Sequence, residues 1–117
     1  MTMRTDRVAS VLKEEVGEYL TRECRDGSYG LITVTDVQIS PDLRIAKIYV
    51  SILGNAEVKA RAMKFLQDRS PELRSQIGAH VRIKFTPELH FFLDETLDRV
   101  EKIEQILRKI HRDGPSA

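Results

Sequence analysis

The sequence has little of what marks a cross-linked, fibrous or disordered chain. Its 117 residues include one cysteine, no tryptophan, six glycines and four prolines. A single cysteine, Cys24, excludes an intramolecular disulfide and any Cys-x-x-Cys metal or redox site, and it is typical of a reducing compartment. A composition this poor in glycine and proline indicates an ordinary globular domain. We therefore expect a chain that folds alone, without a disulfide or a cofactor.

Long hydrophobic runs are missing as well. No segment approaches the ~20 apolar residues that span a bilayer, and the N-terminal MTMRTDRVAS lacks the apolar stretch of a secretory signal. The sequence therefore predicts a cytoplasmic protein that makes no membrane contact. We expect a single domain over residues 1–113, followed by a frayed tail over residues 114–117.

An excess of one charge sign is also absent, because 19 Lys and Arg oppose 18 Asp and Glu for a net charge of +1. This excludes a uniformly basic nucleic-acid coat. The charges are unevenly spread, however: residues 59–84 hold seven Lys and Arg against only Asp68 and Glu72, a local charge of +5. A phosphate backbone is bound mainly through Lys and Arg. The alternative is that these charges only keep exposed helix faces soluble.

The first half of the chain predicts a helix and a β-hairpin. Apolar residues three and four apart from Val8 to Leu20 indicate a helix over residues 5–25, capped by Thr5 or Asp6. Residues 31–39 and 44–52 are rich in β-branched residues and joined by a turn at 40–43. The apolar parity changes at Thr35 and Asp36, so either a bulge lies there or part of the strand is covered on both faces. In the second strand, the core-facing side chains should be Ala46, Ile48, Val50 and Ile52, with Lys47, Tyr49 and Ser51 facing away.

The second half predicts a kinked helix pair, a strand and a last helix. Asn55 should cap a helix over 56–68, and Ser70 with Pro71 indicates a new helix start that runs to Gly78. A third strand is expected over 81–85, broken at Pro87, with residues 89–93 as its continuation. A final helix should start at Asp94 or Thr96. Its inward residues should be Leu97, Val100, Ile103, Ile106, Leu107 and Ile110.

These elements follow the order helix, strand, strand, kinked helix pair, strand, helix. Such an order predicts an α+β domain in which a three-stranded sheet is covered on one face by helices. The order of the strands in the sheet stays open, because a crossover into the third strand allows more than one neighbour.

Three segments carry a family resemblance. They are ITVTDVQISPDLRIAKIYVSILG at 32–54, Leu73-Arg74 followed by Ile77-Gly78, and TPELHFFLDET at 86–96, with Arg4, Arg7 and Val8 matching as well. Together they closely resemble bacterial ribosome-binding factor A, over nearly the whole chain. The resemblance implies a type II KH-like fold and a monomeric factor that binds the immature small (30S) ribosomal subunit. It also implies a role in late maturation and processing of 16S ribosomal RNA, importance in cold adaptation, and no catalysis. A GTPase acting on the same particle is a further implied partner.

The candidate RNA-binding residues combine the basic centre with this resemblance. KH domains usually bind RNA through a GxxG loop between paired helices, which the family replaces with an Ala-x-Gly kink. Here the matching positions are Arg69, Ser70 and Pro71, and a helix starting at Pro71 would add amide donors at its N-terminus. The candidates are Arg4, Arg7, Arg44, Lys59, Lys64, Arg69, Ser70, Arg74, Arg82 and Lys84. Arg44, with Lys47 and Tyr49 on the outer sheet face, forms a second candidate RNA-binding patch. For Lys47 and Tyr49, an ordinary exposed sheet face is at least an equal alternative.

Other function classes have weaker support in the sequence. No HExxH, nucleophile elbow or phosphate-cradling glycine loop is present, so we expect neither catalysis nor a metal. The low aromatic content favours recognition of RNA shape over base stacking. Glu14, Glu15, Glu18 and Glu23 make the first helix acidic, so that face should point away from RNA. The alternative function is a protein-interaction module without RNA contact, which salt dependence would distinguish.

Overall fold

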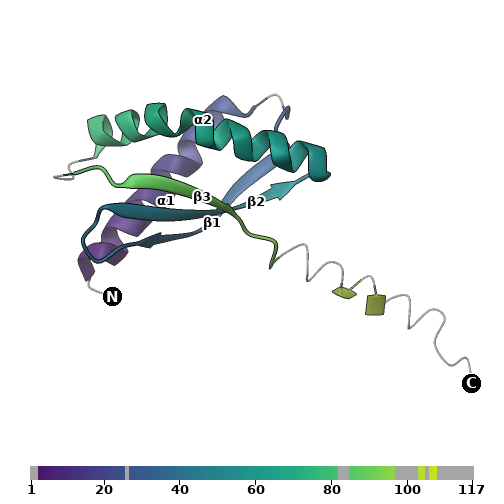
Figure 1. Cartoon of the computed structure of the whole chain (residues 1–117), viewed down its shortest axis with the longest axis horizontal. Coiled ribbons are helices and arrows are strands. Elements are labelled where there is room, and N and C mark those ends of the chain that lie inside the picture. Colours follow the sequence, from purple (N-terminus) through teal and green to yellow (C-terminus); the bar gives the residue numbers. More distant parts are fainter. Residues whose placement is uncertain (1–2, 26, 82–84, 97–102, 105, 108–117) are drawn as a thin grey trace, which may run out of the picture.

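The computed structural model describes residues 3–25, 27–81, 85–96, 103–104 and 106–107. Its elements are α1 (Met3–Glu23), β1 (Leu31–Ile39), β2 (Ile45–Leu53), α2 (Ala56–His80) and β3 (Glu88–Leu93). The strands form one sheet in the order β1-β2-β3, antiparallel between β1 and β2 and parallel between β2 and β3. Helix α1 packs mainly against β1 and α2 mainly against β3 (Figure 1). The predicted α+β class is confirmed, and the central position of β2 answers the question of strand order.

The hydrophobic core lies between the sheet and the two helices. Helix α1 buries Leu12, Val16, Tyr19 and Leu20, the stripe that its spacing predicted. The predicted cap is wrong, since α1 begins at Met3, and Thr5 is a buried residue inside it. The loop after α1 enters β1 at Gly30, which has a φ of +68° and a position where a Cβ would collide with the Leu53 carbonyl oxygen. Only glycine fits that close approach.

The hairpin confirms the predicted alternation of the second strand, and of the two alternatives for the first strand it shows the bulge. Ala46, Ile48, Val50 and Ile52 are buried, while Lys47 is exposed. The pairing shifts between Val34 and Asp36, which opposes Tyr49. The extra residue, Thr35, has a hydroxyl whose single proton lies within reach of two acceptors, Asp94 Oδ2 at 2.7 Å and the Tyr49 carbonyl oxygen at 3.2 Å. The bulge lets both Val34 and Val37 reach the core despite their opposite parity.

The predicted kinked helix pair is wrong, because α2 is one continuous helix with Pro71 inside it. Asn55 caps its start as predicted, its side chain accepting the Val58 N–H at 2.8 Å. The buried residues Ala62, Leu66, Leu73 and Ile77 keep a single helical phase across Pro71. Burial of that continuous stripe against the sheet outweighs the hydrogen bond that proline removes. Ser70 therefore caps no helix, and no free helix N-terminus exists at Pro71.

The third strand is displaced from its predicted position. The strand is Glu88–Leu93, which was the predicted continuation, while Val81 caps α2 and Phe85 is 69% exposed. Strand pairing begins directly after Pro87, whose missing N–H cannot join a ladder. Residues 82–84 lie outside the described part of the chain.

The predicted C-terminal helix lies mostly outside the described residues, as do Leu97, Val100, Ile110 and the tail at 114–117. Its start agrees with the structure, because Thr96 is helical and donates its N–H to Asp94 Oδ1 at 3.0 Å. Of the residues predicted to face inward, Ile103, Ile106 and Leu107 are among the described ones, and they are 51 to 56% exposed. The core-facing side of the sheet is already covered by α1 and α2, which explains why these three side chains are not part of the core.

Candidate nucleic-acid interface

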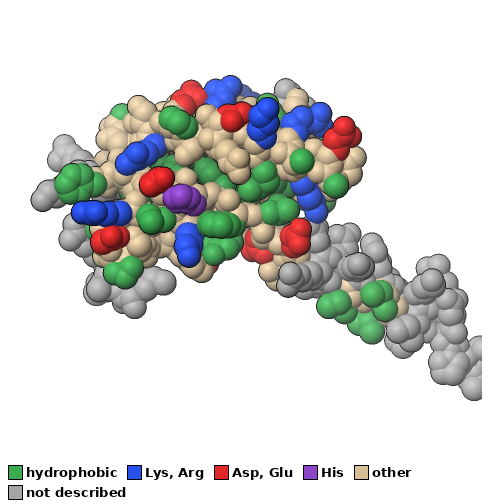
Figure 2. All heavy atoms as spheres, in the orientation of Figure 1, with side chains coloured by type: hydrophobic (Ala, Val, Ile, Leu, Met, Phe, Trp, Pro, Cys, Tyr) green, Lys and Arg blue, Asp and Glu red, His purple; other side chains and the backbone are tan. Residues whose placement is uncertain are grey.

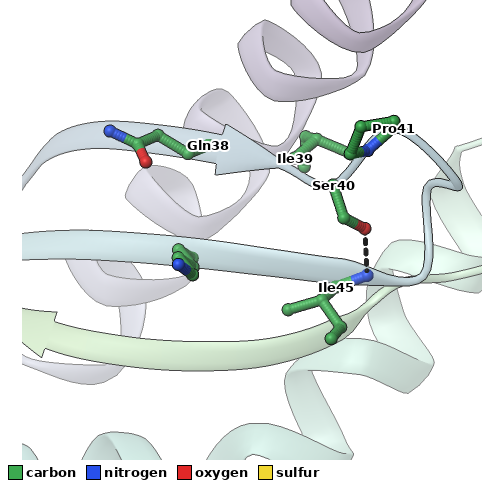
Figure 3. Close-up of a pocket in the computed structure, with 6 residues that line it drawn as sticks. Gln38, Ile39, Ser40, Pro41 and Ile45 are labelled. Atoms are coloured by element: carbon green, nitrogen blue, oxygen red, sulfur yellow. Dashed lines mark hydrogen bonds between the residues drawn. The ribbon is translucent and has the colours of Figure 1, made fainter.

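The turn between β1 and β2 holds Arg44 at one end of the sheet. Ser40 organises it: its hydroxyl donates to Asp42 Oδ1 at 2.6 Å and accepts the Ile45 N–H at 3.0 Å (Figure 3). Leu43, with φ at +62°, closes the turn by donating its N–H to the Ser40 carbonyl oxygen at 2.8 Å. The Ser40 hydroxyl and then the Arg44 N–H keep the pKa of Asp42 below its usual value. The result is a fixed turn on which the Arg44 side chain is 83% exposed.

A cleft next to this turn brings two of the candidate arginines together. Its lining residues are Asp42, Arg44, Arg74, Phe85, Thr86 and Glu88. Arg74 reaches it from α2, donating from Nε and Nη2 to the Thr86 carbonyl oxygen at 3.2 and 2.9 Å. The Glu88 N–H donates to the Arg44 carbonyl oxygen at 2.8 Å, so the start of β3 lies against the end of the turn.

The cleft combines two guanidinium groups with two carboxylates. Arg44 lies 4.0 Å from Asp42, an exposed pair that solvent screens strongly. Arg74 bonds to a neutral carbonyl and so keeps its full charge for a ligand. Guanidinium groups present several N–H donors in a planar fork that matches phosphate oxygens. This cleft can therefore hold an anionic group such as a phosphate at its two arginines.

Arg69 lies on the other flank of α2, and it is part of an internal network. Its Nη1 donates to Glu72 Oε2 at 2.7 Å, and the Tyr19 hydroxyl donates to the same oxygen at 3.1 Å. The hydrogen bonds from Arg69 and Tyr19 lower the pKa of Glu72, and the bond to Glu72 raises the pKa of Arg69. Burial first, and then the bond to Glu72, raises the pKa of Tyr19 to about 12. This network ties α2 to α1 and leaves Arg69 occupied.

The predicted basic centre is therefore divided over several faces of α2. Arg74 is five positions after Arg69, which places the two about 140° apart around the helix. Lys64 is exposed on the side opposite buried Ala62, and Lys59 is half-buried. Ser70 is half-buried within the continuous helix. Of the candidates on α2, the cleft includes only Arg74.

The remaining candidates are distant in sequence from α2 or outside the described residues. Arg7 is exposed on the first turns of α1. Arg82 and Lys84 lie outside the described residues, as does the side chain of Arg4. The sequence-based candidates did not include Phe85, Thr86 and Glu88, which line the cleft. Pro87, between Thr86 and Glu88, was the signal that strand pairing begins at the next residue. Among the described residues, no group of three or more His, Cys, Asp or Glu could hold a metal ion.

Neither long helix has the apolar window that a bilayer crossing requires, as far as the described residues extend.

The acidic side of α1 contacts α2 at one point, because Glu15 lies 3.5 Å from His80 of α2. Glu14 and Glu18 are exposed on the same helix. The described surface thus has an acidic side on α1 and an arginine-lined cleft at the β1–β2 turn.

Comparison with known proteins agrees with this fold. The crystal structure of ribosome-binding factor A from Thermus thermophilus is similar to this chain with a TM-score of 0.66 and 24% identity, covering 76% of this chain and 94% of that one. The solution structure of a candidate ribosome-binding factor A from Thermotoga maritima gives a TM-score of 0.56 and 26% identity, covering 77% of this chain and 82% of that one.

A third similar structure is a homology model of the Thermus thermophilus factor, fitted into a cryo-EM map of its complex with the 30S subunit. It gives a TM-score of 0.63 and 24% identity, and covers 74% of this chain and 90% of that one. A family model described as ribosome-binding factor A matches residues 4–107. Since that match spans most of the 117 residues, this chain belongs to the ribosome-binding factor A family.

Proposed function

We propose that this chain binds the immature small (30S) ribosomal subunit and assists late maturation and processing of its 16S ribosomal RNA without catalysing a reaction. The observation that carries the proposal is the family match over residues 4–107. The Thermus thermophilus factor fitted into a map of a 30S complex, whose fold this chain shares, supports the same partner. The proposal includes a cytoplasmic site of action, a monomeric state, importance for growth in the cold, and other assembly factors, such as a GTPase, on the same particle.

The geometry suggests how such a factor would hold ribosomal RNA. Arg44 and Arg74 line one cleft from two different elements, so a phosphate placed there meets donors fixed by the turn and by α2. Binding of this kind releases counterions and weakens as salt rises. Glu14 and Glu18 are exposed on α1, which does not line the cleft, and they repel phosphate. RNA contact is thus one-sided, which fits a protein with a net charge of +1.

A protein-interaction module is the second candidate, favoured by the exposed Phe85 and by the two carboxylates in the same cleft. Co-sedimentation with purified small-subunit precursors at increasing salt separates the two. An RNA-driven complex loses affinity steeply between low and physiological salt, whereas an apolar protein contact hardly changes. Association that persists unchanged across that range would favour the interaction module over the proposed function.

A further inference from the structure

The face of the sheet turned away from the helices carries a feature that the candidate cleft does not use. Its side chains come from the positions that alternate with the buried ones, and β2 and β3 place them in register: Lys47 opposes His90, and Tyr49 opposes Phe92. On the β1 side, Gln38 opposes Lys47 and Asp36 opposes Tyr49. In Figure 2, hydrophobic side chains lie beside a histidine and cations on the face toward the viewer.

Two aromatic rings form the centre of this outer face. The rings of Tyr49 and Phe92 are stacked, with centroids 5.5 Å apart and planes 28° apart, so each ring covers part of one face of the other and leaves its second face for a ligand. Phe92 is 42% exposed although it lies within a strand. Thr35, which bonds both to the Tyr49 carbonyl oxygen and to Asp94 after β3, fixes the backbone on either side of the pair. The two rings are held by paired strands rather than by a loop, and their relative position is therefore fixed.

The neighbours of this pair distinguish it from an ordinary apolar protein contact. The nearest side chains in register are polar or charged: Asp36 opposes Tyr49, and Lys47 and His90 precede the two rings by two residues. The exposed apolar residues Leu31, Ile45 and Leu53 lie at the ends of the strands. The core of an apolar interface is instead depleted of charged residues. Aromatic rings with a cation and hydrogen-bonding side chains beside them suit unpaired nucleotides, because bases stack on the rings and cations meet the phosphates.

We propose that this outer face, centred on Tyr49 and Phe92, is a second RNA contact that stacks unpaired bases of the small-subunit precursor. The proposal rests on the proposed function, and its ligand is single-stranded RNA. Lys47 meets the backbone phosphate. Gln38 donates from Nε2 to Asp36 Oδ2 at 3.2 Å, and this bonded pair offers its remaining donor and acceptor positions to base edges. The cleft would hold folded RNA by its phosphates, and the outer face would hold a segment that has not yet paired.

The test compares rings with aliphatic side chains of similar apolar character. The double variant Tyr49→Leu and Phe92→Leu keeps an apolar sheet face but removes base stacking, and Leu53→Ser is the control for losing an exposed apolar side chain elsewhere on β2. The full chain is titrated with an unstructured oligouridylate and with its duplex, by fluorescence anisotropy. Tyrosine emission gives a second readout, because the chain has three tyrosines and no tryptophan.

The wild-type chain should prefer the single strand, with its tyrosine emission quenched on binding. The double leucine variant should bind at least about tenfold more weakly, since stacking dominates sequence-tolerant binding of single strands. The Leu53→Ser control should bind like the wild type. Equal binding by the leucine variant, or equal binding of the duplex, would overturn the proposal. Wild-type self-association that the leucine variant abolishes would show that a second copy covers this face, and would also overturn it.

Co-sedimentation with small-subunit precursors separates this inference from the proposed function. If the wild type associates with precursors but not with the single strand, only the outer-face contact is wrong. If the wild type associates with neither, the proposed function itself fails.

Discussion

Replacing both Arg44 and Arg74 with glutamine should lower the salt dependence of RNA binding. Each phosphate neutralised by a cation contributes about 0.9 to the slope of log affinity against log salt on a duplex. Two contacts therefore account for about 1.8 units of slope. Arg44 already lies 4.0 Å from Asp42, so part of its charge is balanced before binding, whereas the hydrogen bonds of Arg74 within the described part of the chain go to a neutral carbonyl. We accordingly expect the slope to fall by about 1 to 2.

The assay is a titration of labelled 16S ribosomal RNA at several salt concentrations. The matched control is Lys13→Gln with Arg25→Gln, which removes two exposed charges from α1 and the loop after it. That control changes the net charge equally and should leave the slope unchanged. Removing the Arg74 bonds to Thr86 should cost about 1 kcal/mol of folding stability, so the single variant Arg44→Gln serves as a version without that cost. An unchanged slope in the double variant, or an equal fall in the control, would refute the cleft as the RNA contact.

Two further predictions concern stability. Pro71→Ala should raise the free energy of unfolding by about 1 to 3 kcal/mol in denaturant titrations, because proline inside a helix is disfavoured by about 3 kcal/mol; no gain would mean that a helix starts at Pro71 after all. For Tyr19, the pKa is raised from 10.0 to about 12, so the folded chain holds a proton that the unfolded chain releases. The folding stability that this bound proton contributes is thus complete below about pH 10 and is lost as the pH rises toward 12. The difference in melting temperature between wild type and Tyr19→Phe should shrink over that interval, and a constant difference would contradict the raised pKa.

The hairpin could be predicted almost residue by residue, because alternation from Ala46 to Ile52 and the change of parity between Val34 and Val37 are local signals. The continuity of α2 was also present in the sequence, as a single apolar phase from Ala62 to Ile77. Ser70 and Pro71 gave an opposing signal, and tertiary burial overrode it. The choice between residues 81–85 and 88–93 for the third strand was not decidable from alternation, since both segments alternate.

The candidate site was harder to predict than the fold. Arg44 and Arg74 were both candidates, but nothing local indicates that they share a cleft. They meet because the parallel return of β3 places Thr86 and Glu88 against the β1–β2 turn. The pairing of Arg69 with Glu72 three residues later was predictable from helical spacing, and it explains why this arginine is occupied. Net charge along the sequence overestimated how many of the cations share a face.

The most direct test of the account is a cryo-EM map of this chain bound to a precursor of the small ribosomal subunit. We predict that the β1–β2 turn and the neighbouring part of α2 face ribosomal RNA, with Arg44 and Arg74 at phosphates and the exposed Glu14 and Glu18 of α1 turned away. A map in which α1 lies on the RNA, or in which the cleft faces solvent or only protein, would contradict it.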